Sequence, residues 1–330
     1  MSGPEAMTIL VTGGTGLLGR AIIQSLVDQG VRPRVVTRRP HRALEYFDHR
    51  VTAFEWHPRT EPLPAPALEG VERIIHLMGE PLAGPLSRTK RDRITASRRG
   101  GTQHIADALR HPVHLILASS VAVYGYGEGP AVTEASALPP PSNKLALALL
   151  ACEEEAQQLR DRGSTVTVVR LGHIIAPGGF LDSLHRLHRR GITWQDTHTD
   201  AAIPAIDHAD AVALVGWLAQ SRPLAGPVHA VAPSPLRSAE LKKLLLEASA
   251  RRTLASLPRW ALRSRLGLVA DAICSRQQIT PQRALDAGFV FSRPDPLESV
   301  RALLGEAVTA VARPAGRPSL LASVLRKPKG

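Results

Sequence analysis

The sequence predicts an α/β protein built around a doubly wound parallel sheet, with a small C-terminal α+β lobe. The first observation is a succession of strand, turn and helix: residues 9–11 are apolar, residues 13–19 hold four glycines, and residues 17–27 carry apolar side chains at helical spacing. The second is that such apolar runs recur between longer segments, at residues 33–37, 51–56, 71–77, 113–120 and 166–171. A length of 330 residues suits one large domain and a smaller lobe.

The glycine-rich turn is the strongest functional signal. Gly14-x-Gly16-x-x-Gly19 fits the dinucleotide-binding pattern, and the same turn starting from Gly13 fits the spacing of short-chain dehydrogenases equally well. Such glycines allow a tight turn, the approach of a pyrophosphate to backbone N–H groups, and close packing of helix on strand. The phosphates then lie at the positive end of the helix dipole. The alternative is a tight turn with no ligand.

Composition narrows the class of protein. The formal charge of +12 suits phosphate-rich partners, but the basic residues are scattered, aromatic residues are few and nucleic-acid motifs are lacking, so we expect no nucleic-acid partner. Cys152 and Cys274 are far apart, which predicts neither a disulfide framework nor a metal site. No apolar run is long enough to span a bilayer and the first seven residues do not form a signal peptide, so we expect a cytoplasmic protein without membrane contact.

The end of the second predicted strand bears on the choice of cofactor. In NAD-binding sites, an acidic residue about twenty positions after the glycines binds the ribose 2′-hydroxyl. Arg38 and Arg39 occupy this neighbourhood, and guanidinium groups suit the 2′-phosphate of NADP(H). The sequence therefore predicts NADP(H). The alternative is that both arginines are solvated at a strand end.

Two later strands should bring further groups to the same edge of the sheet. Leu77, Met78 and Gly79 follow the strand at 71–77, and we expect them to lie against the adenosine ribose and phosphates, with the preceding His76 in the core. Serine at the end of the strand at 113–120 can hydrogen-bond a substrate carbonyl, and Tyr124 offers a second hydroxyl.

Several motifs occur in a familiar order: TGGTGLLG at the first turn, HLMGEP after the fourth strand, then Ser97-Arg98, SSVAVYG and RLGHIIAPGG. Together they resemble an atypical extended short-chain dehydrogenase/reductase of the NAD-dependent epimerase/dehydratase superfamily, in particular the YfcH-like or SDR39U-like epimerase family. The resemblance extends from about residue 7 to 305. It implies a Rossmann core, a C-terminal substrate lobe, NADP(H), a small-molecule substrate and a possible homodimer.

The resemblance also defines the expected regions. We expect an NADP-binding core over residues 1–172, a substrate lobe over 173–312 interleaved with the last core strands and helices, and a flexible basic tail over 313–330. The cofactor-binding residues predicted from the motifs are Gly13, Thr15, Gly16, Leu17, Leu18, Gly19, Arg38, Arg39, Leu77, Met78, Gly79, Arg98, Ser119 and Leu171.

The predicted active site departs from the superfamily pattern. Its ordinary members use a serine with Tyr-x-x-x-Lys, in which the lysine lowers the tyrosine pKa so that the phenol can exchange a proton. Here Leu145 and Leu149 occupy those two positions. Superposition on the Val-Tyr-Gly triplet makes Ser120 the substrate-polarising serine. The remaining predicted catalytic residues are Tyr124, which can instead be a packed aromatic residue, and His173, which follows the strand at 166–171.

The second half of the chain gives structural predictions. The histidines 185, 188 and 198 lack the spacing of a metal site, so we expect no metal. Asp210 is predicted to cap a helix, and Trp260 and Phe289 to pack in the interior.

Two functions remain open from the sequence. One is an NADP(H)-dependent oxidoreductase or epimerase that acts on a small carbonyl or hydroxyl compound by hydride transfer. The other is a non-catalytic NADP(H)-binding redox sensor or partner-binding protein, which the loss of the Tyr-Lys pair favours.

Overall fold

A seven-stranded parallel sheet forms the centre of the protein. The computed structural model describes residues 7–58, 60–80, 87–127, 129–141, 144–195, 201–221, 223–249 and 252–312. The strand order is β11-β6-β5-β4-β1-β2-β3, with every pair parallel. The prediction of a doubly wound sheet is confirmed. The strands are β1 (Ile9–Thr12), β2 (Arg34–Thr37), β3 (Thr52–Glu55), β4 (Arg73–His76), β5 (His114–Ser120), β6 (Thr165–Leu171) and β11 (Gly226–Ala230).

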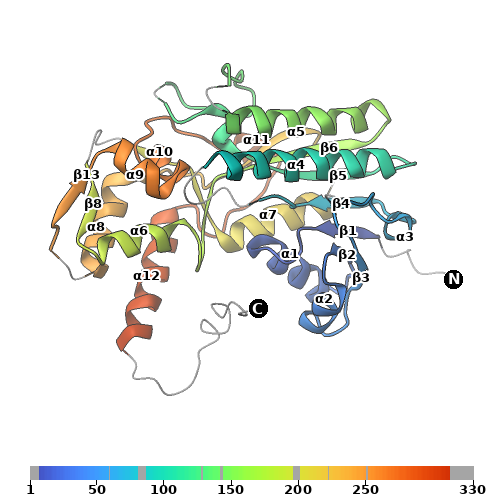
Figure 1. Ribbon diagram of the computed structural model, residues 1–330, viewed down its shortest axis with the longest axis horizontal. Helices are drawn as coiled ribbons and strands as arrows, with labels where there is room; N and C mark the ends of the chain where they lie inside the picture. Colours follow the sequence, from blue (N-terminus) through green and yellow to red (C-terminus); the bar gives the residue numbers. More distant parts are fainter. Residues whose placement is uncertain are drawn as a thin grey trace.

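Helices cover both faces of the sheet, as Figure 1 shows. On one face lie α4 (Arg88–Ala108) and α5 (Lys144–Asp161), and on the other α1 (Leu17–Asp28) and α7 (His208–Gln220). Because successive side chains of a strand point to opposite faces, β1 contributes to two cores. Ile9 and Val11 pack in the cluster that includes α1 and α7, whereas Leu10 packs in the cluster that includes α4 and α5.

Short elements connect these layers. Helix α2 (Pro40–Tyr46) follows β2, α3 (Ala65–Leu68) precedes β4, and the 3-10 turn η1 (Val121–Tyr124) follows β5 directly. The strand order reverses between β1 and β4, because β1 pairs with β2 on one side and β4 on the other. In a doubly wound sheet, the crevice at the carboxyl ends of two such strands is the usual ligand site.

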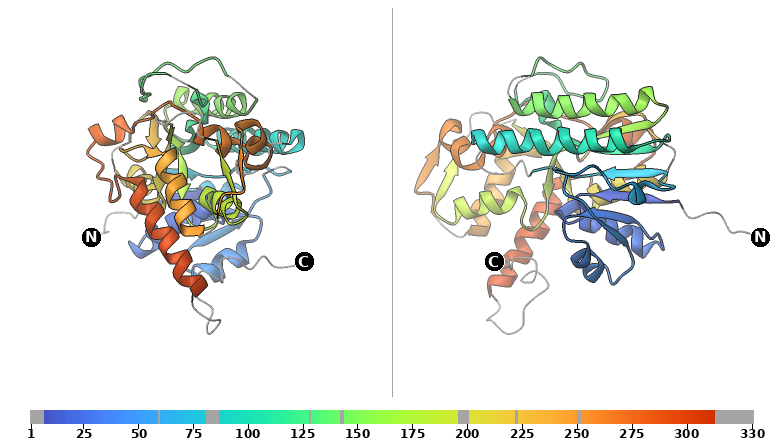
Figure 2. Two further views of the ribbon diagram at one scale, coloured as in Figure 1. Left: turned by 90° about the vertical axis from the view of Figure 1, so that its left-hand side faces the viewer. Right: turned by 45° about the vertical axis from the view of Figure 1, so that its right-hand side comes forward.

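A small lobe lies beyond the carboxyl ends of the strands, at one end of the molecule (Figures 1 and 2). Its core surrounds Leu184, Trp194 and Leu241. The lobe contains the helices α6 (Phe180–His188), α8 (Ser238–Ser249), α9 (Arg259–Leu266), α10 (Leu268–Ile273) and α12 (Pro296–Ala312). Its strand pairs are β7 (His173–Ile175) with β10 (Ala205–Asp207), β9 (Ala202–Ile203) with β12 (Leu236–Arg237), and β8 (Ile192–Trp194) with β13 (Ala255–Leu257).

The chain passes between the lobe and the large sheet more than once. It enters the lobe at β7, returns to the sheet for α7 and β11, and leaves it again for α8. Helix α11 (Gln282–Asp286) then packs against β11. The predicted tail at 313–330 and the stretch 196–200, which includes His198, lie outside the described residues.

The two packing predictions have different outcomes. Phe289 is buried between Trp217 and Phe291, with ring centroids 5.6 and 4.9 Å away, so that prediction is confirmed. The prediction for Trp260 is wrong, because 78% of this residue is exposed. Helix α9 buries the side that carries Leu262 and Leu266, and Trp260 lies about 200° around the helix from Leu262.

The predicted helix cap is also wrong. Asp207, not Asp210, caps α7, because its carboxylate accepts a hydrogen bond from the Ala209 N–H at 2.7 Å. Asp210 lies in the first turn and is 1% exposed. Its carboxylate accepts bonds from the Ser292 N–H (2.8 Å), the Ser292 hydroxyl (2.6 Å) and the Arg293 N–H (2.9 Å). This side chain therefore ties the segment before α12 to the large domain.

We predict that Asp210→Ala lowers the free energy of unfolding by about 1–3 kcal/mol, because it removes the buried acceptor of three hydrogen bonds from Ser292 and Arg293. Urea unfolding measures the change. Asp286→Ala is the matched control, because this exposed carboxylate accepts a hydrogen bond from Gln282 alone among the described residues, and it should change stability by less than about 0.5 kcal/mol. Equal losses in the two variants would contradict the prediction.

Candidate functional site

The glycine turn after β1 lies against the loop after β4. Gly13 has a φ of +71°, and a Cβ at this position would lie 2.7 Å from the carbonyl carbon of Leu77 and 2.8 Å from the Met78 nitrogen. A side chain at position 13 is therefore excluded both by backbone conformation and by the neighbouring main chain. The Gly16 N–H donates to the Gly13 carbonyl at 3.0 Å, and α1 begins immediately afterwards. The first N–H groups of α1 are thus available to an anion.

The predicted residues of this turn divide into two groups. Thr15, Gly16 and Leu17 are exposed where a ligand can reach them. Leu18 and Gly19 are buried, Leu18 in the core beneath α1. A Cβ at Gly19 would collide with the Gly13 carbonyl oxygen, so this glycine permits the helix to approach the turn. Only the backbone of these last two residues can serve a ligand.

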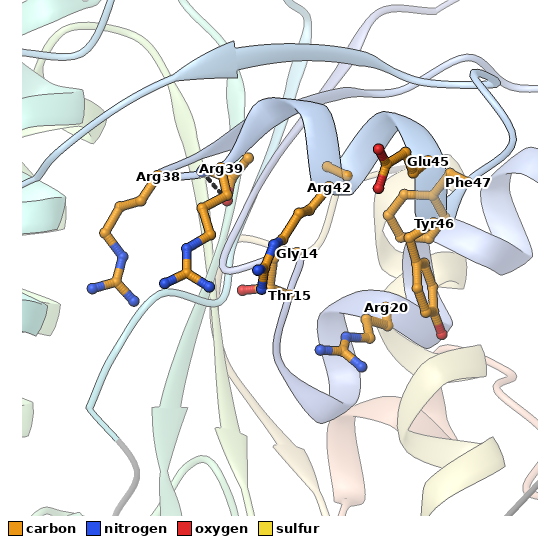
Figure 3. Close-up of a pocket in the computed structure, with 11 residues that line it drawn as sticks. Gly14, Thr15, Arg20, Arg38, Arg39, Arg42, Glu45, Tyr46 and Phe47 are labelled. Carbon is orange, nitrogen blue, oxygen red and sulfur yellow. Dashed lines mark hydrogen bonds between the residues drawn. The ribbon is translucent and has the colours of Figure 1, made fainter. Parts of the chain in front are cut away.

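A cavity of about 630 Å³ opens beside the turn, between α1 and α2 (Figure 3). Arg38, Arg39 and Arg42 extend into it side by side from the end of β2 and the start of α2, and Arg20 faces them from α1. Glu45 is the carboxylate that lines it. The lining residues are Gly14, Thr15, Arg20, Thr37, Arg38, Arg39, Arg42, Ala43, Glu45, Tyr46 and Phe47. Four guanidinium groups beside the free N-terminus of a helix make a strongly anion-binding cavity.

The loop after β4 forms a second wall. Leu77, Met78 and Gly79 are half-buried, and Arg98 from α4 lies directly beneath Gly79. A Cβ at Gly79 would be 2.9 Å from the guanidinium carbon of Arg98. An N–H of this guanidinium donates to the Glu80 carbonyl, with nitrogen and oxygen 2.9 Å apart. Burial lowers the pKa of Arg98. The structure therefore places Arg98 against the loop after β4, where its guanidinium is hydrogen-bonded to the main chain.

His76 is the buried core histidine that the sequence predicts. It is 1% exposed, and its Nδ1 is hydrogen-bonded to the Thr12 hydroxyl at 2.7 Å. Burial, with a smaller contribution from Arg98, lowers its pKa to about 4. The ring is therefore neutral near pH 7 and joins the carboxyl ends of β1 and β4.

The two serines at the end of β5 face opposite sides. The Ser119 hydroxyl donates to Glu153 of α5. The Ser120 hydroxyl donates to the Leu171 carbonyl at 3.3 Å and accepts from the Ala122 N–H at 3.2 Å, so it also caps η1. Both residues are only 8% exposed.

A row of polar side chains crosses three strands next to these serines. Ser119, Arg170 and His229 are register neighbours on β5, β6 and β11. The Arg170 guanidinium binds both carboxylate oxygens of Glu153, at 3.2 and 2.7 Å, and also donates to the Tyr124 hydroxyl at 2.5 Å. Arg170 is 5% exposed and His229 is 0% exposed, so this is a buried ionic network.

The hydrogen bonds of His229 fix the direction of the Tyr124 proton. The His229 Nδ1 lies 2.8 Å from the Thr280 carbonyl and must donate to it. Burial lowers the pKa of His229, so the ring is neutral and its Nε2 accepts. The Tyr124 hydroxyl, 2.9 Å away, therefore donates to His229 and accepts from Arg170. Burial raises the pKa of Tyr124. This phenol is committed to the network.

The positions that hold tyrosine and lysine elsewhere in the superfamily are apolar here. Leu145 and Leu149 are 3% and 1% exposed and pack with Val123 and Val231. The side chain of Lys144 lies outside the described residues. Within the described residues, α5 thus contributes no proton-exchanging group at these two positions.

His173 lies at the start of the lobe. Its ring stacks on Tyr126 with centroids 6.3 Å apart and lies 5.1 Å from Phe180. Among the described residues, its buried Nε2 has no hydrogen-bond partner. Burial lowers its pKa to about 4. Of the predicted catalytic residues, Ser120 and Tyr124 therefore have bonded hydroxyl groups, whereas His173 retains a free ring nitrogen.

The structure adds residues that sequence reasoning missed. For Arg42, the local sequence contains an indication of its position. Pro40 starts a helix, which places Arg42 in the first turn near Arg39. For Arg20, the indication is weaker: it is the residue directly after the last glycine of the turn. His229 gave no local signal, and neither did Glu134, whose carboxylate accepts a hydrogen bond from the His229 N–H at 2.8 Å. Their contacts join residues about a hundred positions apart in the chain.

Neither a metal cluster nor a membrane span is found in the part of the chain that the structure describes. No three His, Cys, Asp or Glu side chains there are placed to share a metal ion. No described helix has the length and apolarity needed to cross a bilayer. Cys152 and Cys274 are buried free thiols.

The family follows from comparison with known sequences. The NAD dependent epimerase/dehydratase family matches residues 9–224. The chain belongs to this family. The match runs from β1 to the segment just before β11, and so includes the glycine turn, the arginine-lined cavity and the two serines.

Similar proteins within this comparison share most of their length with the chain. Epimerase family protein YfhF of Bacillus subtilis is 25% identical over 294 residues, which cover 88% of this chain and 95% of that protein. Epimerase family protein SDR39U1 of Mus musculus is 27% identical over 301 residues, covering 88% and 97%.

Solved structures show the same fold. The crystal structure of human epimerase family protein SDR39U1 (isoform 2) with NADPH superposes with a TM-score of 0.73 at 22% identity, covering 91% of this chain and 99% of that one. UDP-glucose 4-epimerase from Thermotoga maritima with UDP-glucose also gives 0.73, at 17% identity, covering 92% and 100%.

We predict that the protein loses stability as the pH falls from about 6.5 to 4. The pKa of His76, His114 and His173 is lowered from 6.5 to about 4, so below pH 6.5 the unfolded chain binds protons that the folded chain excludes. Each such histidine contributes about 1.4 kcal/mol per pH unit in this window. Urea unfolding at several pH values measures the slope.

The variant His76→Asn tests the assignment to one ring. It removes a single titrating group, so its slope near pH 5 should be shallower than that of the parent by about 1.4 kcal/mol per pH unit. A variant with the parent slope would show that this imidazole is not held neutral in the folded state.

Proposed function

We propose that the protein is an NADP(H)-dependent oxidoreductase or epimerase that acts on a small carbonyl or hydroxyl compound. The observation that carries the proposal is the cavity lined by Arg20, Arg38, Arg39 and Arg42 beside the glycine turn. An NAD-type site has a carboxylate near the end of β2 for the ribose 2′-hydroxyl. Arginine at these positions favours a 2′-phosphate instead.

The chain's own residues fit the cofactor. Gly13 lets the turn lie directly against the main chain at Leu77, and the N-terminus of α1 that follows the turn carries free N–H groups for an anion. Thr15, Gly16 and Leu17 would hold the pyrophosphate, and Leu77 to Gly79 would line the adenosine ribose. The human relative crystallised with NADPH supports this assignment. When bound, the nicotinamide would supply or accept the hydride.

The residues that act on the substrate differ from the superfamily pattern. We assign Ser120 to orient and polarise the substrate oxygen, since it ends β5 at the same edge of the sheet as the glycine turn. For this role its hydroxyl would exchange the 3.3 Å hydrogen bond to the Leu171 carbonyl for one to the substrate. Tyr124 is assigned a positioning role, because its proton is directed to His229. Of the three predicted catalytic residues, His173 is the one whose ring nitrogen has no hydrogen-bond partner among the described residues, and its neutral ring can accept or donate without a charge change.

A second function is favoured by a specific observation. Leu145 and Leu149 replace the proton-exchanging pair with a buried apolar surface, which a non-catalytic redox sensor or partner-binding protein can tolerate. In that case the chain binds NADP(H) through the same cavity but does not turn it over. Binding and turnover experiments separate the two functions.

We predict that the protein binds NADPH at least ten-fold more tightly than NADH. Arg38→Ala and Arg39→Ala should each weaken NADPH binding by about 10- to 100-fold and leave NADH binding unchanged, because each removes a charge-assisted bond to the 2′-phosphate. Fluorescence titration of bound nicotinamide measures both affinities. Arg160→Ala, an equal loss of charge at the far end of α5, is the control. Equal affinities for the two coenzymes in the parent protein would refute NADP(H) specificity.

We predict oxidation of NADPH by at least one member of a library of small carbonyl compounds, followed at 340 nm. Ser120→Ala should reduce kcat by about 10- to 1000-fold, because the hydroxyl no longer stabilises charge on the substrate oxygen. Ser264→Ala, on the exposed side of α9, should match the parent. Tight NADPH binding with no turnover across the library would favour the non-catalytic function.

A further inference from the structure

The arginine-lined cavity holds more positive charge than Arg38 and Arg39 supply. Arg42 enters it from the first turn of α2 and Arg20 from the first turn of α1, on the opposite side (Figure 3). Among the described residues, neither guanidinium has a carboxylate within ion-pair distance. Two further cations therefore face the same cavity from two different helices.

Arg20 is held by an aromatic face. Its guanidinium carbon lies 5.2 Å from the centroid of the Tyr46 ring, within the range of a cation–π contact. Tyr46 is the last residue of α2 and is 56% exposed. The ring is anchored edge-to-face against Phe47, with centroids 4.8 Å apart and an angle of 79°. Phe47 itself is 2% exposed.

These contacts form a chain from the core to the cavity. The buried Phe47 fixes Tyr46, and the face of Tyr46 fixes the guanidinium of Arg20. An arginine on a helix surface otherwise samples many rotamers, and restricting it reduces the entropy lost on ligand binding. A salt bridge to a carboxylate would hold Arg20 too, but would neutralise it, whereas an aromatic face leaves its charge for the ligand.

We propose that Arg20 and Arg42 are specificity-determining residues for the 2′-phosphate of NADP(H), and that Tyr46 is a positioning residue that acts through Arg20. This inference rests on the proposed NADP(H) binding. It assigns the arginine-lined cavity between α1 and α2 to one dianionic phosphate monoester. Guanidinium groups would bind this phosphate from α1 on one side and from β2 and α2 on the other. Arg38 and Arg39 alone would contact such a phosphate from the β2 side only.

The test is titration of the full-length protein with NADPH and, separately, NADH at fixed ionic strength. Arg20→Ala and Arg42→Ala should each weaken NADPH binding by about ten-fold or more and leave NADH binding unchanged. Tyr46→Leu should weaken NADPH binding by about two- to five-fold, the size of an exposed cation–π contact. Tyr46→Phe keeps the aromatic face and should bind NADPH as the parent does.

A double-variant cycle separates positioning from local structure. If Tyr46 acts through Arg20, then Tyr46→Leu added to Arg20→Ala causes no further loss of NADPH affinity. Additive losses, or equal losses for NADPH and NADH in Tyr46→Leu, would overturn the positioning role. Thermal unfolding of each variant shows whether the fold is retained, and Tyr46→Phe provides the conservative rescue.

The outcomes distinguish this inference from the proposed function. If the parent protein shows no preference for NADPH, the proposed cofactor specificity fails, and this inference fails with it. A second outcome is that the parent prefers NADPH and that Arg38→Ala and Arg39→Ala reduce this preference. If Arg20→Ala and Arg42→Ala then leave the preference unchanged, only this inference is overturned.

Discussion

The close approach of Gly13 to the main chain at Leu77 and Met78 is the contact on which the site depends. It joins the carboxyl ends of β1 and β4, where the strand order reverses, and any side chain at position 13 would separate them. The Thr12–His76 hydrogen bond fixes the same two strands one residue earlier. The turn is thereby held with its N–H groups open, and α1 and α2 diverge from it to leave the arginine-lined cavity.

A second constraint acts on the neighbouring strands. Ser119, Arg170 and His229 lie in one row across β5, β6 and β11. Glu153 is hydrogen-bonded to Ser119 in this row, and Tyr124 to His229. A buried ion pair is costly to desolvate, and leaving one partner alone costs more, so such a network specifies a single arrangement. It holds η1, and with it Ser120, at the end of β5.

The sequence predicted what depends on local pattern. The strands, the glycine turn and the position of Arg38 and Arg39 follow from apolar periodicity and from chain distance to the turn. Contacts between distant segments could not be predicted this way. Asp210 lies in the first turn of a helix and has the residue type of a cap, but its carboxylate accepts hydrogen bonds from Ser292 and Arg293. This contact spans about eighty residues of the chain, so the local sequence could not predict it. Trp260 has an apolar ring, yet the helical phase of Leu262 and Leu266 turns it outward.

The two halves of the proposed site match the superfamily pattern to different degrees. The half proposed to bind the cofactor has the glycine turn, the open N-terminus of α1 and an excess of positive charge. Residues near one another in the sequence therefore determine its preference for an anionic ligand. The substrate half has lost both proton-exchanging groups to Leu145 and Leu149, and the nearest phenol, Tyr124, is bonded on both sides. In the proposed enzyme, a proton would therefore move through a group outside α5 or through water. In the proposed enzyme, His173 would be a candidate for this role, because its buried Nε2 beside Tyr126 and Phe180 has no hydrogen-bond partner among the described residues.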